Sequence, residues 1–344
     1  MKNKITVIVP ATSANCGPGY DSLGLACNLY NDFTFEILDT PGFALEVIGE
    51  GEDRLRAGGR NLAFLSFLKV WNEVRGTRIG LKVTMQNRIP LSRGLGSSST
   101  AIVAGLVAAN LLTGSTLPKE RLLNYATEIE GHPDNVAPAL LGGITISYMD
   151  RSGAHSLRFL PQKELRFIAV VPDQPLSTHK ARQAIPQHIP HQDAVFNASR
   201  TALYVGALMS GNYQYLNAAL EDRLHQPYRI PLITGTEAVF EAAKANGAYG
   251  AIISGAGSTL MAYADPENEY LIQNAISKLV KGKTLIVVAH RLATIQKADQ
   301  ILVVENGKIV GCGRQEELLS ECPLYQRLWS DYVSSADQVE GGTF

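Results

Sequence analysis

A run of glycine and serine residues between positions 90 and 100 is the part of the sequence best suited to chemistry. It reads Pro90-Leu91-Ser92-Arg93-Gly94-Leu95-Gly96-Ser97-Ser98-Ser99, and an Ala- and Leu-rich stretch follows from Thr100. Glycines let the backbone approach an anion closely, and a helix N-terminus offers unpaired N–H groups with partial positive charge. The run therefore predicts a phosphate-binding loop at the start of a helix, with a serine hydroxyl as one ligand for Mg²⁺.

This loop does not have the form of a Walker A loop, because the pattern GxxxxGK[ST] is absent from the sequence. Taken alone, a glycine–serine turn before a helix is as often only a good helix cap. Its interpretation as a phosphate site therefore depends on companion segments elsewhere in the chain.

Three such segments are present. Val9–Asp21 reads VPATSANCGPGYD, Glu130–Pro138 reads EGHPDNVAP, and Ser254–Thr259 reads SGAGST. Together with Pro90–Thr100, these segments resemble the motifs of the GHMP small-molecule kinases, in the order in which that family has them, over residues 1–264. The first segment and the one at Glu130 are most similar to the form found in the homoserine-specific branch of the family.

The resemblance implies an α+β fold of two halves with the active site between them. The N-terminal ATP-binding half, with a left-handed βαβ crossover, is expected over residues 1–150, and a ferredoxin-like half over 151–264. The implied reaction transfers a phosphoryl group from ATP, with Mg²⁺, to the side-chain hydroxyl of L-homoserine. Another small alcohol as substrate, or a catalytically impaired fusion product, are the alternatives, and a homodimer is compatible with the family.

On the nucleotide side, the resemblance implies that the loop wraps the β- and γ-phosphates and that Ser98 ligates Mg²⁺. An acidic partner for the metal is expected on the helix before His132, with Glu128 as first choice and Glu130 as second. Residues two apart on a helix face different directions, so one of the two is expected to point into the site. The implied nucleotide-binding residues are Asn61, Pro90, Arg93, Gly94, Leu95, Gly96, Ser97, Ser98, Ser99 and Thr100.

On the substrate side, homoserine is a zwitterion, so its site needs an acceptor for the ammonium group and cations for the carboxylate. The resemblance implies Asp21 as the ammonium partner, and Arg182 and Arg229 as the carboxylate partners. His132 and Thr178 are implied as further contacts.

The implied catalytic residues are Asn15, Asn135 and Arg182. Asn135 stands near the position where several relatives carry an aspartate base, and an amide cannot accept a proton. This favours a mechanism that relies on positioning and charge neutralisation, as phosphoryl transfer allows. Asp134 remains open as a base.

Composition narrows the possible partners. The net charge of −1 gives no electrostatic basis for binding nucleic acid or an anionic membrane. No apolar stretch approaches the roughly 20 residues that span a bilayer. The four cysteines lack CxxC spacing, which favours free thiols in a reducing cytoplasm.

Apolar periodicity predicts the elements that carry the motifs. Residues 5–9 predict a strand that ends at Pro10, and a domain boundary is expected near residue 150. Further strands are expected at 30–38, 80–85, 143–148, 165–171 and within 250–264, and helices at 61–74, 97–112, 119–130, 194–210, 213–220 and 231–246.

From Asp265 the resemblance changes, since residues 265–332 resemble the end of an ABC-transporter nucleotide-binding domain, and we assign 265–344 to this tail. Lys283–Leu292 is similar to its switch-histidine strand, and Asp299–Gly313 to its closing hairpin, with Asn306-Gly307 as the turn. The tail lacks a Walker A loop, a signature and a Walker B pair. His290 is therefore expected to be inert.

Residues just after 264 are predicted to complete the ferredoxin-like half. Glu267–Val280 predicts a helix, with Tyr270, Leu271, Ala275, Leu279 and Val280 at roughly helical spacing. Thr284–Ala289 is an apolar run of strand length. Residues 266–289 are therefore predicted to dock where the family's own last helix and strand would lie.

Overall fold

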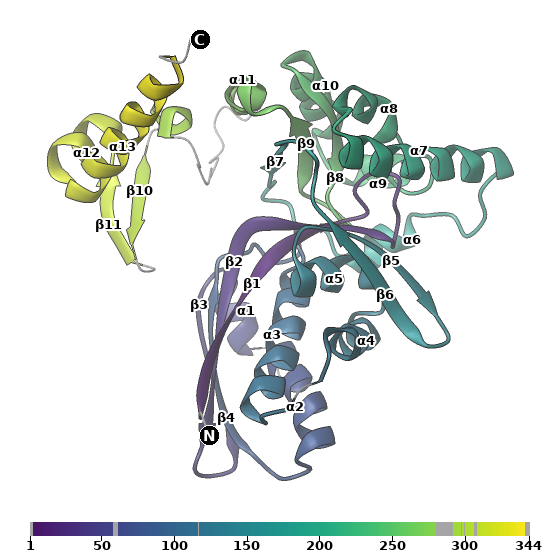
Figure 1. Ribbon diagram of the computed structural model, residues 1–344, viewed down its shortest axis with the longest axis vertical. Helices are drawn as coiled ribbons and strands as arrows, with labels where there is room; N and C mark the ends of the chain where they lie inside the picture. Colours follow the sequence, from purple (N-terminus) through teal and green to yellow (C-terminus); the bar gives the residue numbers. More distant parts are fainter. Residues whose placement is uncertain are drawn as a thin grey trace. The chain divides into compact units, whose positions relative to one another are not determined.

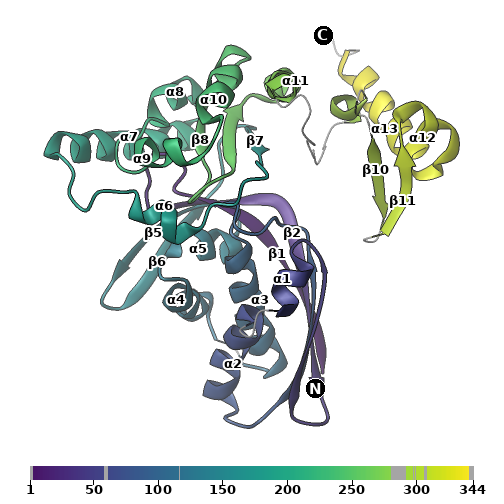
Figure 2. The ribbon, with the colours of Figure 1, turned by 180° about the vertical axis from the view of Figure 1, so that it is seen from behind.

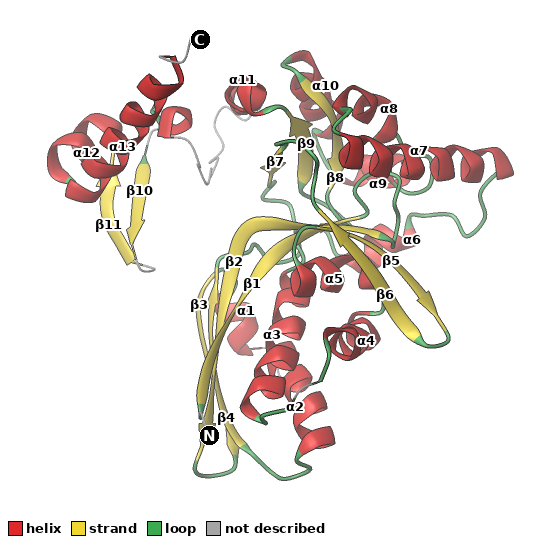
Figure 3. Ribbon diagram, viewed as in Figure 1, coloured by secondary structure: helices red, strands yellow, loops and turns green. Residues whose placement is uncertain are grey.

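The computed structural model describes residues 3–57, 61–115, 117–279, 292–296, 298, 300–305 and 308–340. The chain forms two compact units, Met1–Ile276 and Ser277–Phe344. The first unit contains all four motifs, and it combines a large sheet, a smaller sheet and many helices (Figures 1 and 3). The expected α+β class is confirmed.

The larger sheet is built around one long strand. β2 (Leu23–Leu38) pairs with β1 (Lys4–Ala14) along one edge, and with both β4 (Gly80–Asn87) and β5 (Ile144–Asp150) along the other. The sheet is completed by β3 (Gly42–Gly49), parallel to β4, and by β6 (Gly153–Phe159), antiparallel to β5.

Helices cover one face of this sheet (Figure 1). Phe33 and Phe35 on β2 point into the core while the alternate residues Thr34 and Glu36 do not, as a half-buried strand requires. The apolar stretch after the glycine–serine run forms a helix that is buried nearly all round. The helices are α1 (Glu52–Ala57), α2 (Leu62–Val74), α3 (Ser97–Leu112), α4 (Lys119–Glu130) and α5 (Pro133–Leu141).

The second half of this unit has a three-stranded antiparallel sheet in the order β7-β9-β8. Its strands are β7 (Arg166–Val170), β8 (Ala248–Ile253) and β9 (Leu260–Ala264). Its helices are α6 (Thr178–Gln183), α7 (His191–Ser210), α8 (Leu216–Ala219), α9 (Gln226–Arg229), α10 (Thr236–Ala245) and α11 (Glu269–Leu279). Figure 2 shows these elements from behind. The ferredoxin-like topology and the left-handed crossover stay predictions.

One expected strand end is wrong, and the expected domain boundary near residue 150 stays a prediction. The first strand does not end at Pro10 but continues to Ala14, because a register shift between Pro10 and Thr12 accommodates the proline in the pairing with β2. The boundary near residue 150 falls inside a hairpin, since the turn there joins β5 to β6 and both belong to the larger sheet. The larger sheet therefore continues to Phe159.

The helix expected after the third motif is present, but its buried face was predicted wrongly. Ile272 and Ile276 of α11 pack in the core of the second half. Tyr270, Leu271 and Leu279 are instead 40%, 50% and 49% exposed. The strand expected at residues 284–289 lies outside the described residues.

The second unit contains a hairpin and two helices with a small apolar core. β10 (Ile301–Glu305) pairs antiparallel with β11 (Lys308–Gly313), and α12 (Gln315–Glu321) and α13 (Pro323–Glu340) follow. The core comprises Ile301, Val303, Leu318, Cys322 and Tyr325. His290 and the turn residues Asn306 and Gly307 lie outside the described residues. None of the described helices in either unit is long and apolar enough to cross a membrane.

Candidate active site

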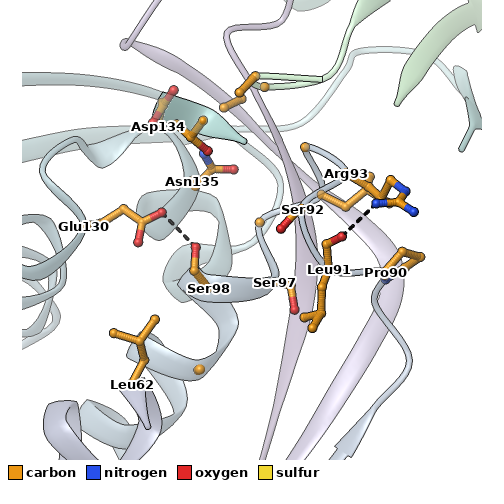
Figure 4. A pocket seen from close by; sticks show the side chains of 18 of the residues that line it. Leu62, Pro90, Leu91, Ser92, Arg93, Ser97, Ser98, Glu130, Asp134 and Asn135 are labelled. Atoms are coloured by element: carbon orange, nitrogen blue, oxygen red, sulfur yellow. Dashed lines mark hydrogen bonds between the residues drawn. The ribbon is translucent and has the colours of Figure 1, made fainter. Parts of the chain in front are cut away.

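A pocket of about 400 Å³ in the first unit brings the four motifs together. Part of its lining is drawn in Figure 4. Most of the predicted site residues line it: Asn15, Asn61, Pro90, Arg93, Gly94, Leu95, Gly96, Ser97, Ser98, Glu130, His132, Asn135, Thr178, Arg182 and Arg229. Four predicted residues are not part of its lining: Asp21, Ser99, Thr100 and Glu128.

The phosphate loop needs glycine at two positions. Gly94 and Gly96 have φ values of +76° and +64°, a region that favours glycine. A Cβ atom on Gly94 would lie 2.2 Å from the carbonyl oxygen of Ser254, and one on Gly96 would lie 1.9 Å from Oγ1 of Thr12. α3 begins directly after Gly96, and no side chain caps it. The first N–H groups of the helix therefore remain available to an anion.

The side chain of Arg93 holds this loop in place, and its expected contact with a nucleotide stays a prediction. Its Nε donates to the carbonyl of Pro172 at 2.8 Å, Nη1 donates to Leu91 at 3.2 Å, and Nη2 donates to Asp173. Three backbone carbonyls thus occupy all three nitrogens of the guanidinium. The side chain links the phosphate loop to the segment that leads into α6 and Arg182.

The acidic residue that faces the phosphate loop is Glu130, the second choice, whereas Glu128, the first choice, does not face it. Oε1 of Glu130 accepts a hydrogen bond from Oγ of Ser98 at 3.1 Å (Figure 4). It also accepts one from Oγ of Ser99 at 3.1 Å. Glu128 points to a different side of α4 and pairs with Lys69 at 2.9 Å. Two positions along a helix correspond to a rotation of about 200°, which explains why one carboxylate serves the pocket and the other does not.

Three of the predicted nucleotide residues have side chains turned into the protein. Leu95 packs in a small cluster with Ala11 and Ile89. Ser99 and Thr100 are fully buried on α3. These residues can therefore contact a nucleotide through the backbone only.

Asn61 caps α2 at another part of the pocket wall. Its side-chain oxygen accepts the backbone N–H of Phe64 at 3.0 Å, and its Nδ2 contacts the sulfur of Met85 at 3.4 Å. Sequence reasoning missed the residues around it that also line the pocket, namely Arg54, Leu55, Leu62 and Met85. They lie on elements without a motif, so no sequence signal marked them.

The loop after β1 is held by Asn15. This residue has φ of +68°, and its side-chain oxygen accepts the backbone N–H of Asp21 at 3.0 Å. Its Nδ2 donates to the carbonyl of Gly255 at 2.9 Å. Both ends of the amide thus bind backbone, which leaves one Nδ2 hydrogen for a ligand. Asn15 joins the first motif to the third.

Asp21 is already paired. Arg182 donates to both of its carboxylate oxygens, at 2.6 and 3.0 Å, and also to the hydroxyl of Tyr20 at 2.8 Å. A bidentate pair of this kind fixes both side chains in one plane. The predicted ammonium partner and one of the predicted carboxylate partners therefore contact each other.

Arg229 is different, because it is a buried cation without a carboxylate partner. Its side chain is 1% exposed, and none of the ion pairs within the described residues includes it. Nε donates to the carbonyl of Ala181 at 3.3 Å, and Nη1 donates to the carbonyl of Gly255 at 2.9 Å and to Nδ1 of His225 at 3.2 Å. Among the described residues, Nη2 has no hydrogen-bond acceptor. Burial lowers the pKa of Arg229.

His132 and Asp134 form a second charged pair beside these groups, through Nδ1 and Oδ1. Burial lowers the pKa of His132, but the hydrogen bond and the charge of Asp134 raise it more, so this pKa lies above its usual value. Ligand atoms of Asp21, His132 and Asp134 all lie within 4.8 Å of one another. Thr178, at the start of α6, lines the pocket as predicted.

Asn135 is positioned as a donor. Its side-chain oxygen accepts the hydroxyl of Thr12 at 2.8 Å, which leaves its amide hydrogens without an acceptor among the described residues. Such a group can stabilise negative charge, but it cannot remove a proton. Thr12 was missed as a site residue, although it lies within the first motif.

The fold and pocket are those of a small-molecule kinase, and comparisons agree. Residues 62–143 match the family model of the GHMP kinases N terminal domain, and residues 202–282 match that of the GHMP kinases C terminal. The second match continues beyond residue 264 through α11. The chain is thus an ATP-dependent small-molecule kinase.

The relatives refine this class. The chain is 45% identical to the homoserine kinase of Carboxydothermus hydrogenoformans over 260 residues, which cover 76% of this chain and 85% of that one. It is 43% identical to the homoserine kinase of a Picosynechococcus species, covering 87% and 99%. The crystal structure of homoserine kinase from Cytophaga hutchinsonii superposes with a TM-score of 0.75 at 30% identity, covering 82% and 92%. The chain belongs to the homoserine kinases of the GHMP family.

Proposed function

We propose that this homoserine kinase binds the phosphates of ATP at the start of α3 and L-homoserine between Asp21 and Arg229. One observation carries the proposal: a single pocket holds both an uncapped helix N-terminus and a buried guanidinium that has no carboxylate partner among the described residues. Burying an unpaired charge is costly unless a ligand completes it. The missing partner of Arg229 is therefore an anion that arrives with the substrate, and the α-carboxylate of homoserine fits.

The nucleotide is proposed to lie along the phosphate loop, with its base near Asn61. The apolar side chains of Leu55, Leu62 and Met85 at that part of the lining suit a planar aromatic ring. The N–H groups of Ser97 and Ser98 then face the phosphates.

A magnesium ion is proposed between Ser98 and Glu130. A hydroxyl and a carboxylate are the hard oxygen donors that this ion prefers, and both atoms are already aimed at each other. When bound, Mg²⁺ neutralises charge on the phosphates of ATP. The protein's contribution is to orient these two oxygens from α3 and α4.

The chain's own residues position the acceptor hydroxyl rather than deprotonate it. Asn135 offers N–H donors to charge that develops on the transferred group. Asp134 is hydrogen-bonded to His132 and buried, so it serves to hold that imidazole. The ammonium group of homoserine is proposed to bind the carboxylate of Asp21. That carboxylate would then accept hydrogen bonds from both the ammonium group and Arg182.

An ADP-release assay tests the proposal. L-Homoserine with ATP and Mg²⁺ should give rapid turnover, and mevalonate and galactose should give none above background. The reaction is proposed to take place in the cytoplasm, where ATP is available. Turnover with mevalonate but not with homoserine would contradict the substrate assignment.

We also propose that the second unit descends from an ABC-transporter ATPase. The support is the order of its elements, since a hairpin (β10–β11) and two helices (α12 and α13) follow one another as the resemblance implies. This segment has no phosphate loop of its own. Equilibrium titration with a non-hydrolysable ATP analogue should therefore give one site per chain, and a second site would contradict the proposal.

A further inference from the structure

His225 is a buried histidine that neither the motifs nor the proposed mechanism uses. It precedes α9, its side chain is fully buried, and it makes two hydrogen bonds. Nε2 lies 2.7 Å from the carbonyl oxygen of Gly17 in the loop after β1. Nδ1 lies 3.2 Å from Nη1 of Arg229.

The chemistry of these two partners fixes the state of the ring. A carbonyl can only accept a hydrogen bond, so Nε2 must carry the hydrogen. A guanidinium can only donate, so Nδ1 must present its lone pair. The contacts are satisfied together by one form of the side chain, the neutral imidazole with hydrogen on Nε2.

The same contacts decide which way Arg229 faces. Both hydrogens of Nη1 are used, one by the carbonyl of Gly255 and the other by His225, and Nε is used by Ala181. Nη2 is left for a ligand. Without an acceptor at His225, Arg229 would keep its contacts with Ala181 and Gly255 but lose the third contact that orients the guanidinium.

We propose that neutral His225 is a positioning residue for the homoserine carboxylate: it holds Arg229 with Nη2 toward the pocket. This inference rests on the proposed function, because it assigns a substrate carboxylate to Arg229. It implies that His225 affects the affinity for amino-acid substrates without contacting them.

The surroundings of the ring support the neutral form. Burial lowers the pKa of His225, Asp222 raises it and Arg229 lowers it, with a net decrease. Oδ2 of Asp222 lies 3.6 Å from Nε2 but is engaged by the backbone N–H groups of His225 and Gln226. From the loop after β1, Tyr20 packs against the ring with centroids 5.3 Å apart, and Asp21 acts through its charge.

Two substitutions separate the contacts of His225. In His225→Gln, the amide nitrogen can still donate to Gly17, but nothing accepts from Arg229. In His225→Asn, the shorter amide places its oxygen near the position of Nδ1, so the contact with Arg229 is kept. Loss of a hydrogen bond to a charged group should raise the KM for homoserine about tenfold or more in His225→Gln, with a much smaller change in His225→Asn. The KM for ATP should not change in either.

A substrate without a carboxylate is the sharpest readout. 3-Aminopropan-1-ol is homoserine lacking that group, so the ratio of kcat/KM between wild type and His225→Gln should fall to near one with it. His188→Gln, an exposed histidine outside the site, is the matched control. Equal effects of both His225 variants, or an undiminished effect with the truncated substrate, would show that His225 only stabilises the fold.

If the variants do not fold, the pH dependence of the wild-type KM for homoserine tests the role of His225. At saturating MgATP, the KM for homoserine should rise as the pH falls below the usual histidine pKa, because a proton on Nδ1 removes the acceptor for Arg229. The pKa of His132 is raised above the usual histidine value and that of His225 is lowered below it, so the two histidines become protonated in different pH ranges. A flat profile below it overturns the inference. Absence of any homoserine binding to wild type by calorimetry would instead overturn the proposed function itself.

Discussion

The two compact units differ in what they bury. The first unit encloses charged and polar side chains, among them Asp134, His225 and Arg229. The described residues of the second unit bury a small set of mainly apolar side chains and no charged one. Burying charge costs free energy, and such groups persist where a ligand or a reaction needs them. The contrast indicates that the chemistry belongs to the first unit and that the second needs only to fold.

The largest expected effect is at the phosphate loop. Gly96→Val should reduce kcat/KM for ATP about 100-fold or more, because the new Cβ would displace Thr12 and shift the loop by about 1 Å. ADP release and thermal unfolding should be measured together. Gly206→Val on α7, where open space surrounds the glycine, is the control. Normal turnover in Gly96→Val would mean that the phosphates bind elsewhere.

Arg229→Ala should be next in size. It removes the buried cation, so homoserine affinity should fall by the about 1.5–3 kcal/mol of a charge-assisted hydrogen bond, while ATP affinity stays nearly constant. Separate titrations with the two ligands measure this. Arg200→Ala, which breaks a surface pair with Glu221, should change neither. Equal losses for both ligands would argue that Arg229 serves the fold and not the substrate.

A third comparison uses two glutamates of the same helix. Glu130→Gln should raise the Mg²⁺ concentration needed for half-maximal activity about 10–100-fold or more, because loss of even an outer-shell partner of a metal typically costs that much affinity. Glu128→Gln removes a surface pair with Lys69, typically worth about 0–1 kcal/mol, and should leave the Mg²⁺ curve unchanged. The reverse order would restore Glu128 as the metal-side residue.

These glutamates show where sequence reasoning reaches its limit. The phosphate loop was predictable because its function lies in consecutive backbone groups, so Gly94, Gly96 and the start of α3 are visible in one stretch of sequence. The rotation of α4 that selects Glu130 depends on packing against α3, which local pattern does not encode. The α+β class and most helices were predictable for the same reason as the loop, since periodicity is local.

The substrate end was predictable only in part. Asp21, Arg182 and Arg229 lie in three separate segments, and resemblance alone brought them together. The pairing of Asp21 with Arg182 joins residues that are 161 positions apart in the chain. His225 holds Arg229 from only four positions away, but His225 is itself fixed by the carbonyl of Gly17, 208 positions earlier. The prediction of the buried face of α11 was wrong for a similar reason. Several apolar residues of this helix could be buried, and packing against the core of the second half decides that Ile272 and Ile276 are.

The smallest expected effect on catalysis comes from the second unit. Leu318 is 3% exposed and belongs to its small core, so Leu318→Ala should cost that core about 2–5 kcal/mol. If the chemistry belongs to the first unit, kcat and both KM values should stay at wild-type levels, while limited proteolysis should cut faster within residues 300–340. His290→Ala should likewise leave turnover unchanged.

The matching substitution in the first unit is at another buried leucine. Leu260 on β9 is 1% exposed and belongs to the second-half core, directly after the third motif. The same truncation, Leu260→Ala, should lower the temperature at which kinase activity is lost. The reason is that this core supports β9, which follows the third motif, and the Gly255 carbonyl of that motif accepts a hydrogen bond from Arg229. If Leu318→Ala reduced homoserine turnover as strongly as Leu260→Ala at the same temperature, the second unit would be part of the working kinase. The contrast in buried charge would then not mark the boundary of function.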